Sequence, residues 1–525
     1  MRTACGNCRK RKIKCDGLRP VCTQCLTRST LEDVCDYGDY GGLTTAEELE
    51  RNIQRLEARI RELEHAEAPD AVRLRQYAGP SEMPQRRDSS RGTPIVSDES
   101  PLELRSSLLQ SFLPQHAAAF GFFLNQPRFA QSTLSVHSAH PSRPCRGLLN
   151  TLYFVASALN YASNPSSQLL IEAVGILSTD HPNKILHAIQ AEILLATWFF
   201  HSNRVLEGKY HLGTAVSLTV GAGLHRIRSP DPNRSSIHTM ALPTPADSIE
   251  EGERIIAFWQ VYAMSNIWDA ISGPASTCVI FNGDGKSIDT PWAWDMHDYE
   301  ELGIPPNLTG GLTVHKFLMR SPDSVNTGLS TTSLFAKASL LFSKAKLFAE
   351  SVFRTGPMQP PSAQAVAYFQ SLNALIDHFT STLAPISPET VMSPALFSQI
   401  TLAHTLAYAS SIHLHSPFAA TDARSSTKML SAAELAVGLL PHLDSLLANS
   451  ENFPVINPIF GALWLLIGKV FVDELRRLRS LRRLSSGTRS NTIFGMLEGL
   501  KRTMEMAGRS SPFIADQFRQ LTEAQ

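Results

Sequence analysis

The sequence lacks several features that would place it in a common class. Its net charge is zero, because 48 lysine and arginine residues balance 48 aspartate and glutamate residues. The N-terminus has no apolar run of the kind found in export signals, and the most apolar later stretch, 460–472, is interrupted by Lys469 and is too short to span a bilayer. We therefore expect a soluble, intracellular protein without a membrane partner, whose attraction to nucleic acid would have to come from local charge clusters.

Motifs for catalysis are also scarce. The sequence contains no evident pair of catalytic carboxylates, no Gly-x-Ser-x-Gly elbow and no phosphate-binding loop. The glycines at Gly221 and Gly223 follow an apolar helical pattern and not a strand, which predicts a helix C-terminus and not a dinucleotide site. His404, His413 and His415 lack the three- or four-residue spacing that places two ligands on one helical face. We expect no enzymatic activity.

Cysteine is rare after residue 35. Only Cys145 and Cys278 lie beyond it, and we expect both to be buried, inert thiols, with a redox sensor as the alternative. The other six cysteines form two Cys-x2-Cys pairs, each followed by a single cysteine: Cys5, Cys8, Cys15, Cys22, Cys25 and Cys35. This spacing predicts zinc ligation, because one turn brings residues i and i+3 together.

The number of sulfurs limits the kind of metal site. Two four-coordinate zinc ions need eight coordination positions, so a two-zinc site built from six cysteines requires two bridging sulfurs. Six thiolates then carry more charge than two divalent ions, and nearby cations can partly offset the excess. The alternatives are a single-zinc finger with two spare cysteines and a disulfide knot, although disulfide scaffolds belong mainly to secreted chains.

A basic run lies between the second and third cysteines and consists of Arg9, Lys10, Arg11, Lys12 and Lys14. With this run, the cysteines and Asp16, the segment resembles the fungal binuclear zinc cluster (six-cysteine) of transcription factors. The last interval between cysteines is nine residues, slightly longer than is usual in that family.

The resemblance implies two Zn²⁺ per chain, bridged by Cys5 and Cys22. It also implies that Lys12, together with Arg11, meets bases of CGG-type triplets in the major groove of double-stranded DNA, from a short helix that begins near Cys8. The other cations of the run would contact phosphates or offset the cluster charge. The implied location is the nucleus.

A second element is predicted after a glycine-rich connector at 36–45. Apolar residues recur there at steps of four and three, which favours a parallel two-stranded coiled coil and therefore a homodimer: Leu49, Ile53, Leu56, Ile60 and Leu63. An amphipathic surface helix is the alternative. The following residues are rich in proline, serine and charge and predict a disordered linker.

The rest of the chain has helical periodicity throughout and little strand alternation. We expect helices over 108–124, 184–200, 208–220, 251–271, 333–353, 363–379, 396–414 and 461–484. No fixed repeat is visible, which favours one irregular all-α domain over a solenoid. The predicted fold is thus mostly α, with a zinc cluster at 1–40, a coiled coil at 46–66, a linker at 67–100 and a helical regulatory domain at 101–525.

Part of this helical region carries a second resemblance. Four stretches follow one another as in the fungal-specific transcription factor middle homology region: Gln190–Ala196, Gly208–Arg226, Glu253–Tyr262 and Ser287–Pro291. The chain has Ser272-Gly273-Pro274 where that family often has Gly-Arg-Pro. The six tryptophans lie among apolar helix positions and are expected in the core, with a pocket lined by Trp259, Trp268 and Asp269 as the alternative.

Together these features predict a zinc-dependent, sequence-specific transcription factor of RNA polymerase II genes. We leave open a small-molecule effector or coregulators as further partners. The alternative function is a helical ligand-sensing or scaffold protein whose zinc module mediates protein contacts. The salt dependence of binding to duplex DNA distinguishes the two.

Overall fold

The computed structural model describes a large part of the chain. The described residues are 4, 5, 8, 12–17, 22–26, 101–135, 143–161, 181–230, 240, 242–273, 283–321, 329–355, 362–386, 394–448, 455–480 and 488–525. The chain divides into two compact units, Met1–Ser90 and Arg91–Gln525. Each is considered by itself.

In the first unit the described residues surround a short helix, α2 (Thr23–Leu26). The predicted coiled coil at 46–66, with Leu49, Ile53, Leu56, Ile60 and Leu63, lies outside the described residues, and so does the predicted linker at 67–100. Both therefore stay predictions.

The second unit is helical wherever the structure describes it. Its α-helices are α4 (Leu102–Gln115), α5 (Gln126–Ser135), α6 (Arg146–Tyr161), α8 (Lys184–His201), α9 (Val205–Gly221), α10 (Ser248–Ser272), α12 (Met296–Glu301), α13 (Thr313–Leu318), α14 (Thr331–Thr355), α15 (Ala363–Thr382), α16 (Pro394–His415), α17 (Ala423–Val437), α18 (Leu440–Ala448), α19 (Ile459–Ser480), α20 (Thr488–Gly508) and α21 (Pro512–Glu523). Short 3-10 turns occupy Leu224–Arg226 and Ser416–Phe418. The prediction of a mostly α chain is confirmed, and none of the described helices is long and apolar enough to cross a membrane.

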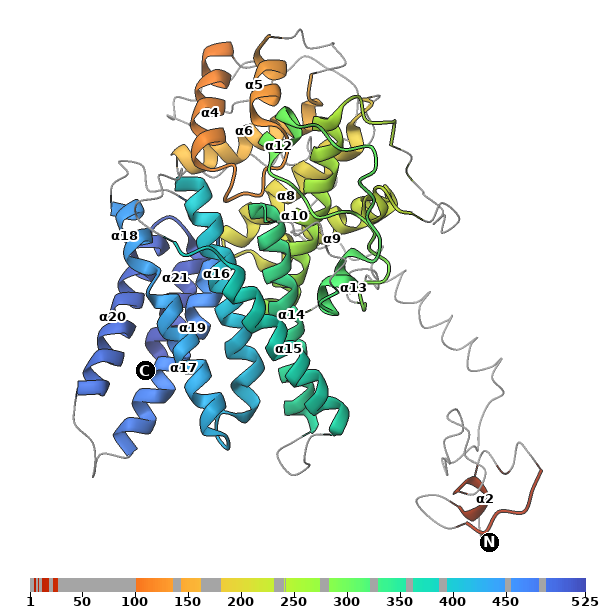
Figure 1. The fold of residues 1–525 in the computed structure, drawn as a ribbon, viewed down its shortest axis with the longest axis vertical. Helices are drawn as coiled ribbons and strands as arrows, with labels where there is room; N and C mark the ends of the chain where they lie inside the picture. The colour runs from red at the N-terminus through yellow and green to blue at the C-terminus, as the bar shows by residue number, and fades with distance from the viewer. Residues whose placement is uncertain are drawn as a thin grey trace, which may run out of the picture. The chain divides into compact units, whose positions relative to one another are not determined.

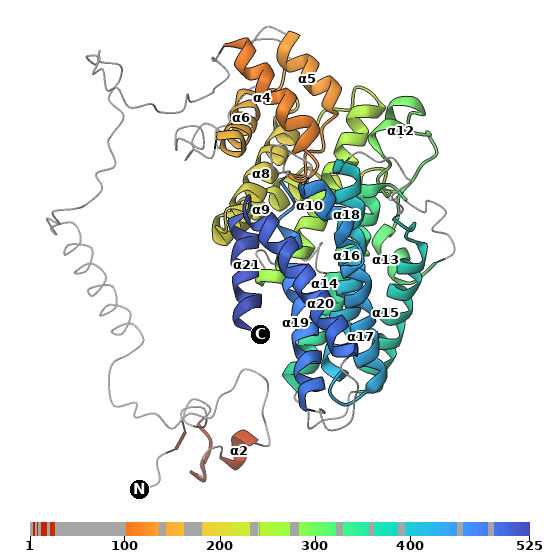
Figure 2. The ribbon, with the colours of Figure 1, turned by 90° about the vertical axis from the view of Figure 1, so that its left-hand side faces the viewer.

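The long helix α14 lies near the centre of this unit (Figure 1). It packs against α10 on one side and α16 on the other, and α16 in turn packs against α17 and α19. The C-terminal helices α19, α20 and α21 pack against one another, and α4, α5 and α6 lie together at one end (Figures 1 and 2). Helices from both halves of the sequence therefore share one body.

One hydrophobic core runs through this body. Its buried members extend from Leu108 in α4 to Leu521 in α21, and they include the fully buried rings of Trp259 and Trp464. At about 25 cal/mol per Å² of buried apolar surface, such continuous burial is the main stabilising contribution to the fold. Helices from α4 to α21 therefore contribute to one core in the described part of the second unit, while the domain bounds at 101–525 stay a prediction.

Polar residues mark where several helices begin. Asp247 precedes α10, and its side chain accepts a hydrogen bond from the amide of Glu250. Ser362, Asp422 and Ser511 do the same at the starts of α15, α17 and α21. Each such cap satisfies an amide that has no partner within its helix and contributes about 1 kcal/mol.

The predicted helix at 108–124 is wrong in its bounds. The helix α4 begins at Leu102 and ends at Gln115, directly after Pro114, which lacks an amide hydrogen for the helical ladder. The chain then turns over 116–121 and passes Gly121, whose positive φ of 68° suits glycine. The apolar residues that follow in sequence enter the core from a loop and not from a helix.

Two glycines allow α19 and α21 to approach closely. A Cβ atom at Gly468 would lie 2.6 Å from the Leu521 side chain, and one at Gly461 would lie 3.1 Å from Ile514. Real Cβ contacts are longer than the first of these, so a side chain at position 468 would force the Leu521 side chain to move. The two glycines therefore allow α21 to pack closely on α19.

Candidate metal centre

Five cysteine sulfurs gather in the first unit. The ligand atoms of Cys5, Cys8, Cys15 and Cys22 all lie within 4.8 Å of one another. The Sγ atom of Cys5 is 3.8 Å from that of Cys22 and 3.7 Å from that of Cys25. The Sγ atom of Cys8 is 3.6 Å from that of Cys22. The structure therefore brings together five of the six predicted ligands, and Cys35 lies outside the described residues.

These distances fit zinc ligation. Two sulfurs bound to one zinc at about 2.3 Å each, with a tetrahedral angle between them, lie about 3.8 Å apart. A disulfide would need the sulfurs about 2.05 Å apart, and none of these five cysteines forms a disulfide with another described cysteine. The donor set thus suits a tetrahedral thiophilic cation and not the disulfide knot.

A helix ending places the first two cysteines. Cys8 is helical, Lys12 has a left-handed backbone with φ of 51°, and the amide of Ile13 donates to the carbonyl oxygen of Cys8 at 3.0 Å. This six-to-one hydrogen bond beside a left-handed residue is the pattern of a Schellman helix end. The Ile13 side chain packs against the cysteines, and the Cys8 amide donates to Cys5 Sγ at 3.4 Å.

An aspartate holds the second pair in place. The carboxylate of Asp16 accepts from the amide of Thr23, the first residue of α2, at 3.1 and 3.3 Å. Since α2 carries Cys25 and directly follows Cys22, this contact links the first half of the segment to the second. In the sequence, Asp16 was used only as part of a family pattern, and this structural role was missed. The signal for it is an aspartate directly after a cysteine, with the second Cys-x2-Cys pair beginning six residues later.

The thiols influence one another electrostatically. Burial raises the pKa of Cys5 and of Cys8. Burial also acts to raise the pKa of Cys22, but hydrogen bonds from the Cys25 amide and from neighbouring thiols outweigh it and lower that pKa to about 6. The thiolate is the form that binds metal, so the hydrogen bonds around Cys22 act in favour of metal binding.

The basic run is only partly described. Lys12 and Lys14 are exposed, while the intervening Ile13 faces the cysteines. Arg9, Lys10 and Arg11 lie outside the described residues. The two described lysines thus present their charges to solvent from the surface of the sulfur cluster.

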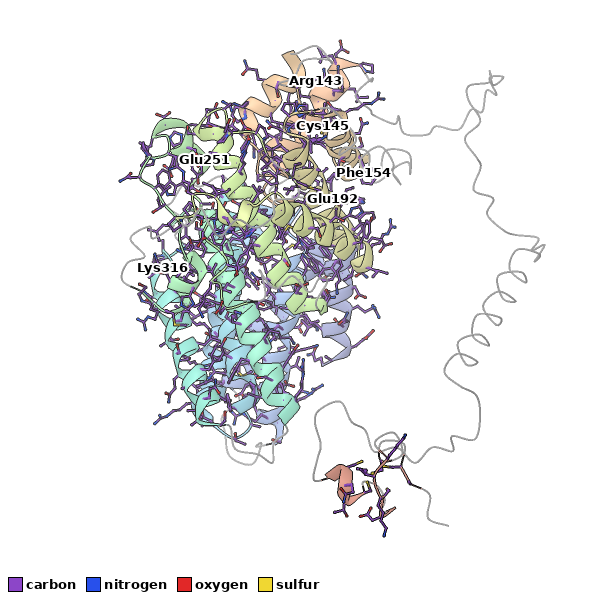
Figure 3. The ribbon with its side chains drawn as sticks, turned by 90° about the vertical axis from the view of Figure 1, so that its right-hand side faces the viewer. Arg143, Cys145, Phe154, Glu192, Glu251 and Lys316 are labelled. Carbon is purple, nitrogen blue, oxygen red and sulfur yellow. The ribbon has the colours of Figure 1, made fainter. Side chains whose placement is uncertain are left out.

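Cysteine and histidine elsewhere have structural surroundings. Cys145 lies just before α6 (Figure 3), and burial raises its pKa to about 11, which keeps the thiol protonated and unreactive. Cys278 lies outside the described residues. His404 hydrogen-bonds the carbonyl oxygen of Ala384, and His415 hydrogen-bonds Ser425 and Asn373. Within the described part of the chain, the sulfur group at the N-terminus is the one cluster suited to a metal.

The glycines Gly221 and Gly223 end a helix, as predicted. α9 ends at Gly221, and Gly223 has a left-handed backbone with φ of 71°. The tryptophan alternative is partly right: Trp268 lines a cavity, whereas Trp259 is fully buried, stacks on Trp292 and donates to the Pro291 carbonyl oxygen.

Comparison with known proteins agrees with this geometry at the N-terminus. The sequence model described as the fungal Zn(2)-Cys(6) binuclear cluster domain matches residues 3–39. The match includes every predicted ligand from Cys5 to Cys35 and the whole basic run. It does not extend into the helical region, so the resemblance of 190–291 to a middle homology region stays a prediction.

The chain is also similar to a yeast protein. It is 35% identical over 88 residues to the heme-responsive zinc finger transcription factor HAP1 of Saccharomyces cerevisiae, in strain Kyokai no. 7 and equally in strain Lalvin EC1118. The match covers 15% of this chain and 6% of the relative. The chain therefore spans only a small fraction of the length of the curated relatives it matches.

Proposed function

Since residues 3–39 are a fungal Zn(2)-Cys(6) binuclear cluster domain, we propose that the chain is a zinc-dependent, sequence-specific DNA-binding transcription factor of RNA polymerase II genes that acts in the nucleus. The observation that carries the proposal is the close group of cysteine sulfurs beside the exposed Lys12 and Lys14. A metal would fix the backbone that presents these cations. The proposal assigns no chemical reaction to the protein.

The metal part of the proposal is two Zn²⁺ per chain, with Cys5 and Cys22 as the bridging ligands and the other four cysteines as terminal ones: Cys8, Cys15, Cys25 and Cys35. A bridging sulfur must lie near terminal ligands of both metals. Cys22 is 3.8 Å from Cys5 and 3.6 Å from Cys8, and Cys5 is 3.7 Å from Cys25. These short distances around Cys5 and Cys22 support their role as the shared pair.

The DNA part of the proposal divides the basic run into two tasks. Lys12, with Arg11, would contact base edges of CGG-type triplets, because a lysine can donate to both guanine O6 and N7 in the major groove. Arg9, Lys10 and Lys14 would contact phosphates. Phosphate contacts position a protein on the duplex and base contacts give it sequence preference.

The third part concerns assembly and control. Leu49, Ile53, Leu56, Ile60 and Leu63 would pair two chains as a short parallel coiled coil, so that two clusters reach one duplex. The helical body at 101–525 would respond to a small molecule or a coregulator. The heme response named for the yeast protein is not carried over, because the match covers 6% of that protein.

Salt titration tests the proposal on the full-length, zinc-loaded protein. Each phosphate neutralised contributes a slope of about −0.9 to the logarithm of affinity against the logarithm of salt concentration. With Arg9, Lys10 and Lys14 assigned to phosphates in each cluster, we expect a slope of roughly −3 per cluster, and tighter binding to duplex with paired CGG triplets than to scrambled duplex. Lys286→Met, which removes an exposed lysine of the helical body, should leave both quantities unchanged.

The same measurement addresses the alternative, a helical ligand-sensing or scaffold protein that uses its zinc module for protein contacts. Such a protein would give a slope near zero and equal affinity for the two duplexes. That result would overturn the proposed DNA-binding function.

A further inference from the structure

The helical body contains a cavity that could hold the small molecule left unidentified in the proposed function. Its volume is about 380 Å³, and it lies where α10, α14, α16, α19 and α21 meet. Figure 1 shows these helices within one body, and α14 with α16, α16 with α19 and α19 with α21 are direct neighbours. The volume falls within the range of about 300–1,000 Å³ that small-molecule sites occupy.

One part of the cavity wall is aromatic and rigid. It is formed by Trp268, Phe342 and Phe513. The ring of Trp268 is 1% exposed and stacks on Phe200, and its centroid is 5.4 Å from that of Phe513 at a steep angle. Leucines of α19 extend this surface. Because these rings are fixed by the core, the wall is preformed for a flat or branched apolar group.

Another part of the wall is polar and cationic. Lys346 from α14, Lys469 from α19 and Gln517 from α21 all line the cavity. Lys346 is 3.5 Å from Glu350, and among the described residues Lys469 makes no ion pair. No aspartate or glutamate is among the described residues that line the cavity. The cavity therefore carries an excess of positive charge.

Gln517 adds an uncharged polar group to this wall. The residue is 8% exposed and lines the cavity. Its side-chain amide can donate a hydrogen bond to an acceptor that occupies the cavity. The helix packing fixes its position, because a Cβ at Gly461 would lie 3.3 Å from Gln517 Cγ.

Two further groups adjust the charge of the site. Burial, and secondarily the positive charge of Lys346, lowers the pKa of His413 to about 3, so this lining ring is neutral at physiological pH and can donate one hydrogen bond. The carbonyl groups that end α10 would repel an anion. Lys209 donates to two of them, the carbonyl oxygens of Ser272 at 3.2 Å and of Gly273 at 2.7 Å, and so reduces this repulsion.

We propose that this cavity binds a small monocarboxylic acid with an aromatic or branched apolar body. The carboxylate would accept hydrogen bonds from Lys346, Lys469 and Gln517, and the apolar body would pack against Trp268 and Phe513. A single negative charge matches a site whose cations are two lysines and whose remaining wall is largely apolar. The inference concerns the helical body and does not depend on DNA binding.

Three probes with the same body and different heads test it. 4-Phenylbutanoate, 4-phenylbutan-1-ol and 4-phenylbutylammonium are titrated into the full-length protein, and heats of binding are measured. We expect the carboxylate to bind with a dissociation constant on the order of 1 mM or tighter, which is typical for a ligand of this size. The alcohol should bind several-fold more weakly, and the ammonium should bind weakest because the lysines repel it.

Variants locate the site. Lys346→Met and Lys469→Met together should lower the affinity for 4-phenylbutanoate about tenfold, since each partly exposed ion pair contributes a factor of up to roughly five in affinity. The affinity for the alcohol should stay unchanged. Lys469 is exposed, so Lys469→Met alone keeps the test valid if the double variant is unstable. Ala462→Leu, which adds volume to the cavity lining, should lower the affinity for the carboxylate and for the alcohol by similar factors. Lys286→Met is the matched control and should change neither.

Each outcome bears on the proposal. A carboxylate preference that falls with the lysine variants and not with the control supports it. Three results would overturn it. The first is equal binding of the three probes, and the second is no measurable carboxylate binding at about 10 mM. The third is a loss of carboxylate affinity in the lysine variants that is no larger than the loss in Lys286→Met.

Discussion

The amide of Ile13 donates a 3.0 Å hydrogen bond to the carbonyl oxygen of Cys8. Directly before Ile13 lies Lys12, whose backbone is left-handed with φ of 51°. A left-handed backbone at a residue other than glycine or asparagine costs roughly 1 kcal/mol. The chain accepts this cost at the lysine that we propose reads bases.

The first prediction uses this backbone geometry. Asparagine tolerates the left-handed conformation, so Lys12→Asn removes the charge without adding strain. We expect it to lower the preference for a CGG-containing duplex over a scrambled one by about 1–3 kcal/mol. Lys14→Asn should weaken both duplexes alike, because Lys14 is assigned to phosphate. Competition binding with the two duplexes measures the difference, and equal losses in the two variants would reject the division of tasks.

The second prediction concerns metal content. A segment of about 35 residues has too small a core to fold without its metal. We expect two zinc ions per chain in the wild type, and nearly none in Cys5→Ser or Cys22→Ser, because each of these removes a ligand shared by both metals. Cys145→Ser, outside the cluster, should retain both ions. Elemental analysis of the purified proteins measures this, and one zinc per wild-type chain would exclude the bridged cluster.

The third prediction concerns pairing of chains. Ile53→Asp combined with Leu56→Asp places charges in the predicted seam, where burial of an unpaired carboxylate is costly. Binding to duplex with two triplets should fall to the level of single-triplet binding, measured by gel shift with half-sites at varied spacing. Glu57→Asp with Glu62→Asp, off the seam, serves as the control. Unchanged spacing preference in the seam variant would mean that the segment is a surface helix.

The fourth prediction is a pH effect at Glu253. Burial raises the pKa of Glu253 to about 7, although the Asn125 amide donates to it at 2.8 Å and Arg128 attracts it. The ordinary pKa of a glutamate is about 4.3. At pH values between about 4.3 and about 7, unfolding therefore releases the proton that the folded carboxyl holds. The free energy of unfolding therefore falls as pH rises through this window.

Glu253→Gln removes that penalty and can keep the hydrogen bond from Asn125. We expect the variant to gain stability over the wild type progressively from pH 5 to pH 7, reaching a few kcal/mol by order of magnitude. Thermal unfolding across this range measures the gain. Glu301→Gln, at an exposed position, is the control. A constant difference for Glu253→Gln would contradict the buried, protonated carboxyl.

The fifth prediction concerns His201, which is 2% exposed and whose two ring nitrogens have no hydrogen-bond partner among the described residues. Burial, and then the charge of nearby His116, lowers its pKa to about 4. The free energy of unfolding therefore does not suffer from this shift above the ordinary pKa of about 6.5. It falls as the pH drops from there toward 4, because only the unfolded chain gains a proton on this ring in that range.

His201→Phe replaces the ring with an apolar one of similar size. We expect a gain of about 1 kcal/mol at pH 7, because the unsatisfied nitrogens are removed, and a smaller loss of stability between pH 6.5 and pH 4 than in the wild type. The exposed His297→Phe is the control. Denaturant unfolding at several pH values measures both effects, and a destabilised variant at pH 7 would mean that the ring nitrogens are satisfied after all.

Sequence patterns located several of the long helices that are rich in apolar residues. The expected helix at 184–200 is α8, Lys184–His201, and the expected helix at 251–271 is α10, Ser248–Ser272. The patterns did not include α6 (Arg146–Tyr161), in which Asn150, Thr151 and Ser157 interrupt the apolar residues. The expected helix at 461–484 corresponds to α19, Ile459–Ser480, and its last predicted residues lie outside the described ones.

The cluster could be predicted because its ligands are close in sequence. Cys5 and Cys22 are separated by 17 positions, and the spacing of neighbouring cysteines carries the geometry. The cavity could not be predicted in the same way. Lys346 and Gln517 come from helices that are distant in sequence, and only the packing of α14, α19 and α21 brings them to one wall. Trp268 was a candidate for a pocket, but Trp259, nine positions earlier on α10, faces the core.

The docking of α21 has a consequence for how the chain matures during synthesis. Ser511 donates to the carbonyl oxygen of His201 at 3.2 Å, and Phe513 packs on Trp268, so the body closes only when its final helix is available. Ribosomes add about 5–20 residues per second, so residue 39 precedes residue 512 by roughly 25–95 seconds. The cysteine-rich segment can therefore acquire its metal on the nascent chain, well before the helical body has finished folding.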